Sequence, residues 1–193
     1  MRIANYMIRK NVLFCKLNRI KISSLALFQS FMDSFRPQDE ECPVCHSTGN
    51  CRIHSYYNRN LIDFFHGCTR YSTVKVLRVI CTSCGHTHAI LPDLVIPYST
   101  YGLTFILHVL NDHFSKRFSI LQVCEKYAIS PPMLYRWQAL FLLHKELWLG
   151  VLESAVLQPV VFLEQLCSAE SASGFFLNFF QLTGFSFLQC HSG

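Results

Sequence analysis

The chain has 193 residues and a formal net charge of +5, and 51% of its residues are apolar. This length fits one domain or two small ones with enough apolar residues for a buried core. No stretch approaches the roughly 18 consecutive apolar residues of a membrane span, so we expect no membrane-spanning segment.

Residues 1–37 carry most of the excess charge, with seven Lys or Arg and one Asp. The segment is basic and mildly amphipathic, and three interpretations stay open. It could be a nucleic-acid-binding arm, a helix on a membrane surface, or a stretch translated from an early start codon, with Met32 as the alternative start. A secretory leader is not apparent in it, because no compact apolar stretch precedes a small-residue cleavage site.

Residues 38–97 contain two Cys-x-x-Cys pairs, Cys42 with Cys45 and Cys81 with Cys84. Each pair places two thiolates on a tight turn, and two pairs supply the four sulfur ligands of a closed tetrahedral structural zinc site. We expect a reducing, cytoplasmic setting, where such pairs bind metal rather than form disulfides. An iron–sulfur centre and a redox dithiol are the alternatives.

Other side chains near these pairs could replace one of the four ligands. These candidates are Cys51, Cys68, His46, His54, His86 and His88. Residues 74–80 are β-branched and run directly into the second pair, residues 51–57 could pair with them, and residues 86–91 form a closing strand that Pro92 stops. Residues 38–97 are therefore predicted to form a small β zinc ribbon.

Residues 98–149 read as three helices. Ser99 is expected to cap the first, Ser119 begins the second, and Ser130 caps the third with Pro131 at its first position. The second and third helices are separated by a turn of three or four residues, which is typical of a helix-turn-helix module.

Residues 150–193 form an apolar tail that has three Glu and no Lys or Arg. We expect a helix near residues 153–166. Six of the residues 175–188 are Phe, and they are too many to leave in water. The tail is predicted to pack onto the helical module or to form a homodimer.

Three parts of the sequence resemble the front end of insertion-sequence transposases, in which a zinc ribbon precedes a helix-turn-helix. They are the run from Cys81 to Asp93, residues 96–98 and residues 129–137. The chain is also similar to a bacterial family of small zinc-ribbon proteins of unknown function. The resemblance covers about residues 40–149 and implies DNA binding through the third helix.

By position, the resemblance implies DNA contacts from Ser130, Met133, Tyr135 and Arg136. The basic residues Lys116 and Arg117 of the same module are expected to add phosphate contacts. Two positions depart from the usual pattern. Ala128 stands where a turn glycine is common, and Met133 stands where a threonine often contacts phosphate.

The acidic residues do not fit a transposase catalytic domain. Strand transfer with two metal ions uses three carboxylates on a separate α/β fold, whereas residues 150–193 offer Glu153, Glu164 and Glu170 and no Asp. No nucleophile motif or phosphate-binding loop occurs. We therefore expect a non-catalytic protein without a small-molecule substrate.

Together these patterns predict an α+β chain: a β zinc ribbon, an all-α helix-turn-helix module and a helical tail. The predicted function is a zinc-binding, DNA-binding protein related to transposase front ends, as an accessory protein, regulator or remnant of a mobile element. The alternative is a zinc-stabilised protein-interaction module that binds no nucleic acid.

Overall fold

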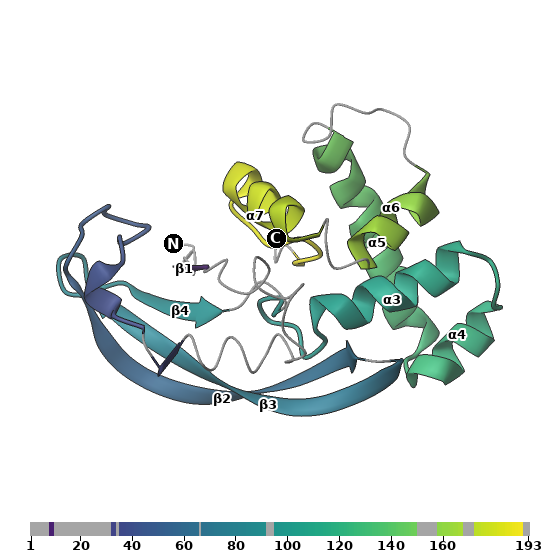
Figure 1. The fold of residues 1–193 in the computed structure, drawn as a ribbon, viewed down its shortest axis with the longest axis horizontal. Coiled ribbons are helices and arrows are strands. Elements are labelled where there is room, and N and C mark those ends of the chain that lie inside the picture. The colour runs from purple at the N-terminus through teal and green to yellow at the C-terminus, as the bar shows by residue number, and fades with distance from the viewer. Residues whose placement is uncertain are drawn as a thin grey trace. The chain divides into compact units, whose positions relative to one another are not determined.

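The computed structural model describes residues 8–9, 32–33, 35–65, 67–91, 95–149, 158–167 and 172–190. Most of the basic segment 1–37 and the first part of the expected 153–166 helix lie outside the described residues. The described part combines a sheet with helices, which confirms the α+β class (Figure 1). Its elements are β1 (Ile8–Arg9), η1 (Pro37–Asp39), β2 (Cys51–Phe65), β3 (Cys68–Cys81), β4 (Thr87–Leu91), α3 (Leu103–Phe114), α4 (Ile120–Tyr127), α5 (Pro131–Leu149), α6 (Pro159–Cys167) and α7 (Ala172–Thr183).

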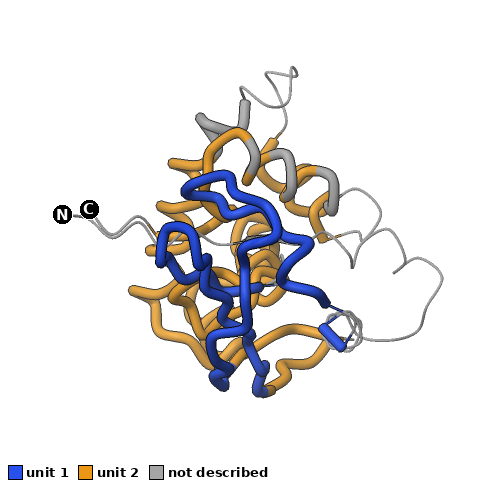
Figure 2. Tube along the Cα trace, turned by 90° about the vertical axis from the view of Figure 1, so that its left-hand side faces the viewer, with its two compact units in different colours: residues 1–60, 73–93 blue, residues 61–72, 94–193 orange. Residues whose placement is uncertain are grey.

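The chain divides into two compact units (Figure 2). Unit 1 comprises residues 1–60 and 73–93, and unit 2 comprises residues 61–72 and 94–193. The sequence predicts boundaries at residues 97 and 149. In the structure, the end of the β2–β3 hairpin belongs with the helices, and the tail lies in the same unit.

Unit 1 is built on strands in the order β1-β4-β3-β2. β3 and β4 are antiparallel, with Leu77 opposite Ile90 and Ile80 opposite Thr87, and the short β1 pairs in parallel with β4. The strands predicted at residues 74–80, 51–57 and 86–91 are confirmed, although β2 and β3 are longer than expected. The second Cys-x-x-Cys pair begins at the last residue of β3 and lies in the turn before β4, whereas the first pair lies between η1 and β2.

In unit 2, the three helices α3, α4 and α5 each contact the other two. Their shared core contains Leu103, Phe105, Ile106, Leu110, Val123, Leu134, Trp137 and Phe141, all buried. The three predicted helices are therefore present. The start of α4 is also as expected, because the Ser119 hydroxyl accepts a hydrogen bond from the Gln122 N–H while the Gln122 side chain accepts one from the Ser119 N–H.

The predicted cap of the first helix is wrong. The Ser99 hydroxyl bonds to the backbone of Tyr101, and α3 begins later, with Gly102 as its N-cap residue. Asp63, from the end of β2, serves this helix start instead, since its carboxylate accepts hydrogen bonds from the backbone N–H groups of Phe64 and Phe105. Burial nevertheless raises the pKa of Asp63.

The close approach of Asp63 requires a small residue at the helix start. A Cβ atom on Gly102 would lie 3.2 Å from Asp63 Oδ1 and 3.4 Å from the Ile62 carbonyl oxygen. Ile62 also pairs with this segment, because its N–H donates to Thr100 and its carbonyl accepts from Gly102. A distant strand end thus determines where α3 begins.

The Phe-rich tail is buried inside unit 2. Phe175, Phe176, Phe179 and Phe187 are all at most 9% exposed. The imidazole of His144, on α5, lies against the rings of Phe179 and Phe187, and its Nδ1 atom accepts the Leu188 N–H at 3.1 Å. The tail therefore packs onto the helical module, which is one of its two predicted arrangements. The other, a homodimer formed through the tail, stays a prediction. In the ranges that the structure describes, no helix is long and apolar enough to cross a membrane.

Ala128 adopts the conformation that glycine usually takes after a helix. It ends α4 with φ 51° and ψ 47°, in the left-handed region. A residue with a side chain loses roughly 1–2 kcal/mol of stability in this conformation, and glycine avoids that loss. Glycine also has more freedom in the unfolded chain, which lowers stability by about 0.4–1 kcal/mol and offsets part of the benefit.

Replacing Ala128 by glycine should therefore raise the free energy of unfolding of unit 2 by about 0.5–1 kcal/mol. The matched control is Ala139→Gly on an exposed face of α5, which should lower it by about 1 kcal/mol. Urea titrations followed by circular dichroism measure both. Destabilisation by Ala128→Gly would contradict the left-handed turn.

Candidate functional site

The two Cys-x-x-Cys turns share one backbone pattern. In the first, the Cys42 N–H donates to the Ser47 carbonyl at 3.0 Å, and the His46 N–H donates to the Cys42 carbonyl at 2.8 Å. In the second, the Cys81 N–H donates to the His86 carbonyl at 2.9 Å, and the Gly85 N–H donates to the Cys81 carbonyl at 2.8 Å. Each turn is therefore closed by the same two backbone hydrogen bonds at its first cysteine.

The fifth residue of each turn has a positive φ. It is 56° at His46 and 73° at Gly85. Glycine adopts this conformation without strain, whereas histidine is uncommon there. Because φ is positive at both positions although one residue is histidine, the turn and not the residue type imposes this backbone conformation.

The four cysteine sulfur atoms converge. The Sγ atoms of Cys42, Cys45, Cys81 and Cys84 all lie within 4.8 Å of one another. Cys42 Sγ is 3.6 Å from Cys84 Sγ, and Cys45 Sγ is 3.7 Å from Cys81 Sγ. At the usual zinc–sulfur distance of about 2.3 Å, the edges of a sulfur tetrahedron are about 3.8 Å long. The sulfur positions therefore fit a tetrahedral metal ion, and these four cysteines could hold one.

Ionisation of the four thiols is unequal. The Ser47 hydroxyl lies 3.1 Å from Cys45 Sγ and 3.4 Å from Cys81 Sγ, and its hydrogen bonds lower the pKa of Cys45 and lower that of Cys81 to about 5. The His86 N–H lowers the pKa of Cys84, but burial and the neighbouring thiols outweigh it and raise that pKa to about 12. A cation among the four sulfur atoms would favour the thiolate form of all four.

Two further residues border the sulfur cluster. His88 on β4 is 1% exposed, and its Nε2 atom lies 3.4 Å from Cys42 Sγ. Such an outer contact orients a ligand and stabilises its negative charge. Cys51 is also fully buried and packs with Cys42 and Cys81. Burial and the charges of these cysteines raise the pKa of Cys51, so it supports the site as a neutral thiol.

The other proposed replacement ligands lie apart from the cluster of four sulfurs. His46 is exposed and bonds Glu41 through Nδ1 at 2.7 Å, and His54 bonds Ser55. Cys68 is exposed at the start of β3. The sequence predicts His88 only as a possible replacement ligand. Because side chains alternate along a strand, His88 shares the buried face of β4 with Ile90, and this alternation is the pattern that indicates a buried histidine beside the site.

The residues predicted to contact DNA differ in accessibility. Ser130, Tyr135 and Arg136 are exposed at and near the start of α5, and Lys116 and Arg117 are exposed in the turn after α3. Met133 is half-buried, and its sulfur accepts a hydrogen bond from the Tyr101 hydroxyl at 3.9 Å. The Arg136 Nη2 atom lies 3.3 Å from Cys190 Sγ.

Another basic side chain of the module is held by a carboxylate. Lys126 Nζ lies 2.6 Å from Asp112 Oδ2, and the Tyr127 hydroxyl donates to the same oxygen at 2.9 Å. Burial, followed by the hydrogen bond and charge of Asp112, raises the pKa of Tyr127. These contacts join α3 to α4 and leave Lys116, Arg117 and Arg136 as the more accessible cations.

Comparison with known proteins identifies one domain. Residues 42–130 match the family described as "Domain of unknown function (DUF6431)". The matched range contains all four cysteines of the cluster and ends at Ser130. No curated protein and no solved structure matches the chain.

Proposed function

We propose that the chain is a non-catalytic DNA-binding protein whose ribbon is held by a structural zinc ion, similar in plan to the front end of insertion-sequence transposases. The observation that carries the DNA-binding proposal is the arrangement of α4 and α5. Only residues 128–130 separate these helices, the turn begins with the left-handed Ala128, and both helices pack on α3. A short turn between two packed helices supports a helix-turn-helix.

Zinc is the metal that best suits the cluster. Four thiolates at tetrahedral spacing form a closed site, which leaves no position for a water or a substrate. Iron–sulfur centres remain the alternative that the same ligands could serve. No disulfide joins any of the nine cysteines in the described ranges, which supports a reducing compartment and, with it, a cytoplasmic location.

Electrostatics supports weak binding. Lys116 and Arg117 are exposed just before α4, and Arg136 is exposed in the second turn of α5, so each could contact a phosphate group. Few contacts imply modest affinity that falls as salt rises. The role of an accessory protein, regulator or remnant of a mobile element follows from the resemblance alone.

The second candidate function is protein interaction without nucleic acid. Ile53, Tyr56 and Tyr57 of β2 are 55%, 51% and 40% exposed, and Lys75 lies 4.6 Å above the Tyr56 ring. Successive side chains of a strand point to opposite faces, so Tyr56 and Tyr57 place one exposed aromatic ring on each face of the sheet. Exposed aromatic side chains are enriched where proteins meet partners, which supports this second candidate.

The test is fluorescence anisotropy of labelled random and defined duplexes with the metal-loaded protein at low salt. We expect weak binding whose affinity falls linearly with the logarithm of salt concentration. Arg136→Ala should cost about 1–3 kcal/mol on preferred sequences if the guanidinium reads a base edge. If it contacts phosphate alone, binding should weaken equally on every duplex.

Arg78→Ala is the control, because Arg78 is an exposed arginine on β3 in unit 1. It should leave affinity within about twofold of the unchanged protein, since it lies outside the proposed interface. A loss as large as that of Arg136→Ala would move the interface to the ribbon. Absence of any binding at low salt would favour the protein-interaction candidate.

A further inference from the structure

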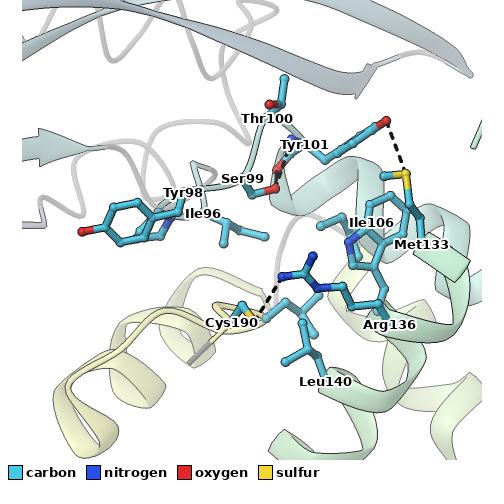
Figure 3. Close-up of a pocket in the computed structure, with 13 residues that line it drawn as sticks. Ile96, Tyr98, Ser99, Thr100, Tyr101, Ile106, Met133, Arg136, Leu140 and Cys190 are labelled. Carbon is cyan, nitrogen blue, oxygen red and sulfur yellow. Dashed lines mark hydrogen bonds between the residues drawn. The ribbon is translucent and has the colours of Figure 1, made fainter. Parts of the chain in front are cut away.

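Unit 2 contains a cavity of about 550 Å³ beside the start of α5 (Figure 3). It is bounded by residues 96–101, by Ile106 of α3, by side chains of α5, and by Leu188 and Cys190. Its volume lies within the range of about 300–1,000 Å³ that small-molecule sites occupy. The cavity adjoins the helix start proposed to contact DNA, and Met133 and Arg136 belong to both.

The inner wall of the cavity is apolar and aromatic. Trp137 is almost buried and stands edge-on to the Tyr101 ring, with 5.0 Å between the ring centroids. Ile106, Leu140 and Leu188 complete the apolar surface. Such a wall favours a hydrocarbon or aromatic body over a sugar or a phosphate ester.

One charged side chain faces this wall. Arg136 lines the cavity, and its Nη2 atom is directed at Cys190 Sγ, 3.3 Å away (Figure 3). None of the lining residues is Asp or Glu, and no described carboxylate pairs with Arg136. A thiol is a weak acceptor and occupies one of the five guanidinium donors. A carboxylate accepts two of them at once, with the matching planar geometry.

Two of the five described non-glycine residues with a positive φ lie at this cavity. Tyr98 and Leu188 both line it, and their φ angles are 61° and 60°. Bulky residues rarely adopt the left-handed region, and such outliers cluster where a ligand is held. Tyr98 is also 74% exposed at the rim of the cavity.

We propose that this cavity binds a small organic acid that has an aromatic or aliphatic body and one carboxylate. The body packs against Trp137, and the carboxylate replaces the Cys190 thiol as the partner of Arg136. The acid is proposed as a ligand that is bound and released without reaction, so it differs from the small-molecule substrate that the sequence gives no reason to expect.

Ligand binding has a consequence that rests on the proposed function. Arg136 is also a proposed DNA contact, so a carboxylate bound to it would compete with phosphate or base edges. The acid would then lower DNA affinity, which is the behaviour of a ligand-responsive regulator.

The test measures ligand binding directly and needs no DNA. The full-length, metal-loaded protein carries Trp148→Phe, so Trp137 is its single tryptophan. It is titrated with 3-phenylpropionate, with the neutral 3-phenylpropanamide, and with acetate, while tryptophan fluorescence is recorded. We expect saturable binding of 3-phenylpropionate, at least about tenfold weaker binding of the amide, and no saturation by acetate in the same range.

Arg136→Gln should reduce the affinity for 3-phenylpropionate to that of the amide, whereas the control Arg78→Gln should leave it unchanged. Circular dichroism verifies that both variants are folded. Absence of saturable binding by any probe, equal affinity for acid and amide, or an unchanged preference in Arg136→Gln would overturn the proposed site. Addition of the acid to the anisotropy assay then tests the competition. Unchanged DNA affinity at saturating acid would overturn the competition alone.

Discussion

Removal of the metal should unfold the part of unit 1 that carries the cysteines, residues 42–60 and 73–91, and leave most of the helix in residues 103–149. The buried cluster around Cys42, Cys51 and Cys81 consists largely of the ligands themselves, so little apolar packing remains there once the metal leaves. Binding free energies for structural zinc are about 10–16 kcal/mol, and in small ribbons that energy is the folding energy. The helical unit has its own core, centred on Phe105, Leu110 and Phe141.

Circular dichroism and hydrogen exchange after chelation measure the two parts separately. The matched variants are Cys81→Ser and Cys68→Ser, at the two ends of β3. Cys81 is buried in the cluster and Cys68 is exposed outside it. We expect Cys81→Ser to lose the metal and the exchange protection of the ribbon, and Cys68→Ser to retain both. Complete loss of helix on chelation would show that the two units fold as one.

Replacement of Phe179 by alanine should cost unit 2 about 3–5 kcal/mol of its free energy of unfolding. Phe179 is fully buried, and its ring contacts those of Phe175, Phe185, Phe187 and His144. Loss of the ring leaves a cavity that several rigid neighbours border, and rigid neighbours relax little.

Denaturant titration followed by far-ultraviolet circular dichroism checks this expectation. Leu182→Ala is the control on the same helix, since Leu182 is 68% exposed and should change the free energy by less than about 0.5 kcal/mol. A chain that ends at Glu170 should be poorly soluble, because it uncovers Phe141 and His144. A stable, soluble, monomeric truncation would contradict a core role for the tail and would also remove it from any homodimer.

Local patterns made the cluster of four cysteines and one helix start predictable. The spacing within Cys42-x-x-Cys45 and Cys81-x-x-Cys84 is enough to form each turn, and β3 brings the second turn to its place. Ser119 and Gln122 form a reciprocal cap within four residues. In both cases the interacting groups are neighbours in the sequence.

Contacts between residues that are far apart in the sequence could not be predicted from local patterns. Asp63 supplies the hydrogen bonds that Ser99 was expected to give, because the β2–β3 hairpin extends much further than its β-branched residues indicate. His88 reaches Cys42 across 46 positions, and Arg136 reaches Cys190 across 54. The strand register and the path of the tail determine these contacts, and neither leaves a local pattern.

X-ray absorption spectroscopy of the purified protein, with metal analysis of the same sample, tests the metal centre most directly. We predict one zinc ion per chain, with four sulfur neighbours at about 2.3 Å and no nitrogen or oxygen in the first coordination sphere. A shell that contains nitrogen would instead make His88 a ligand. Iron in place of zinc, or a protein that remains folded without any metal, would contradict the structural zinc site.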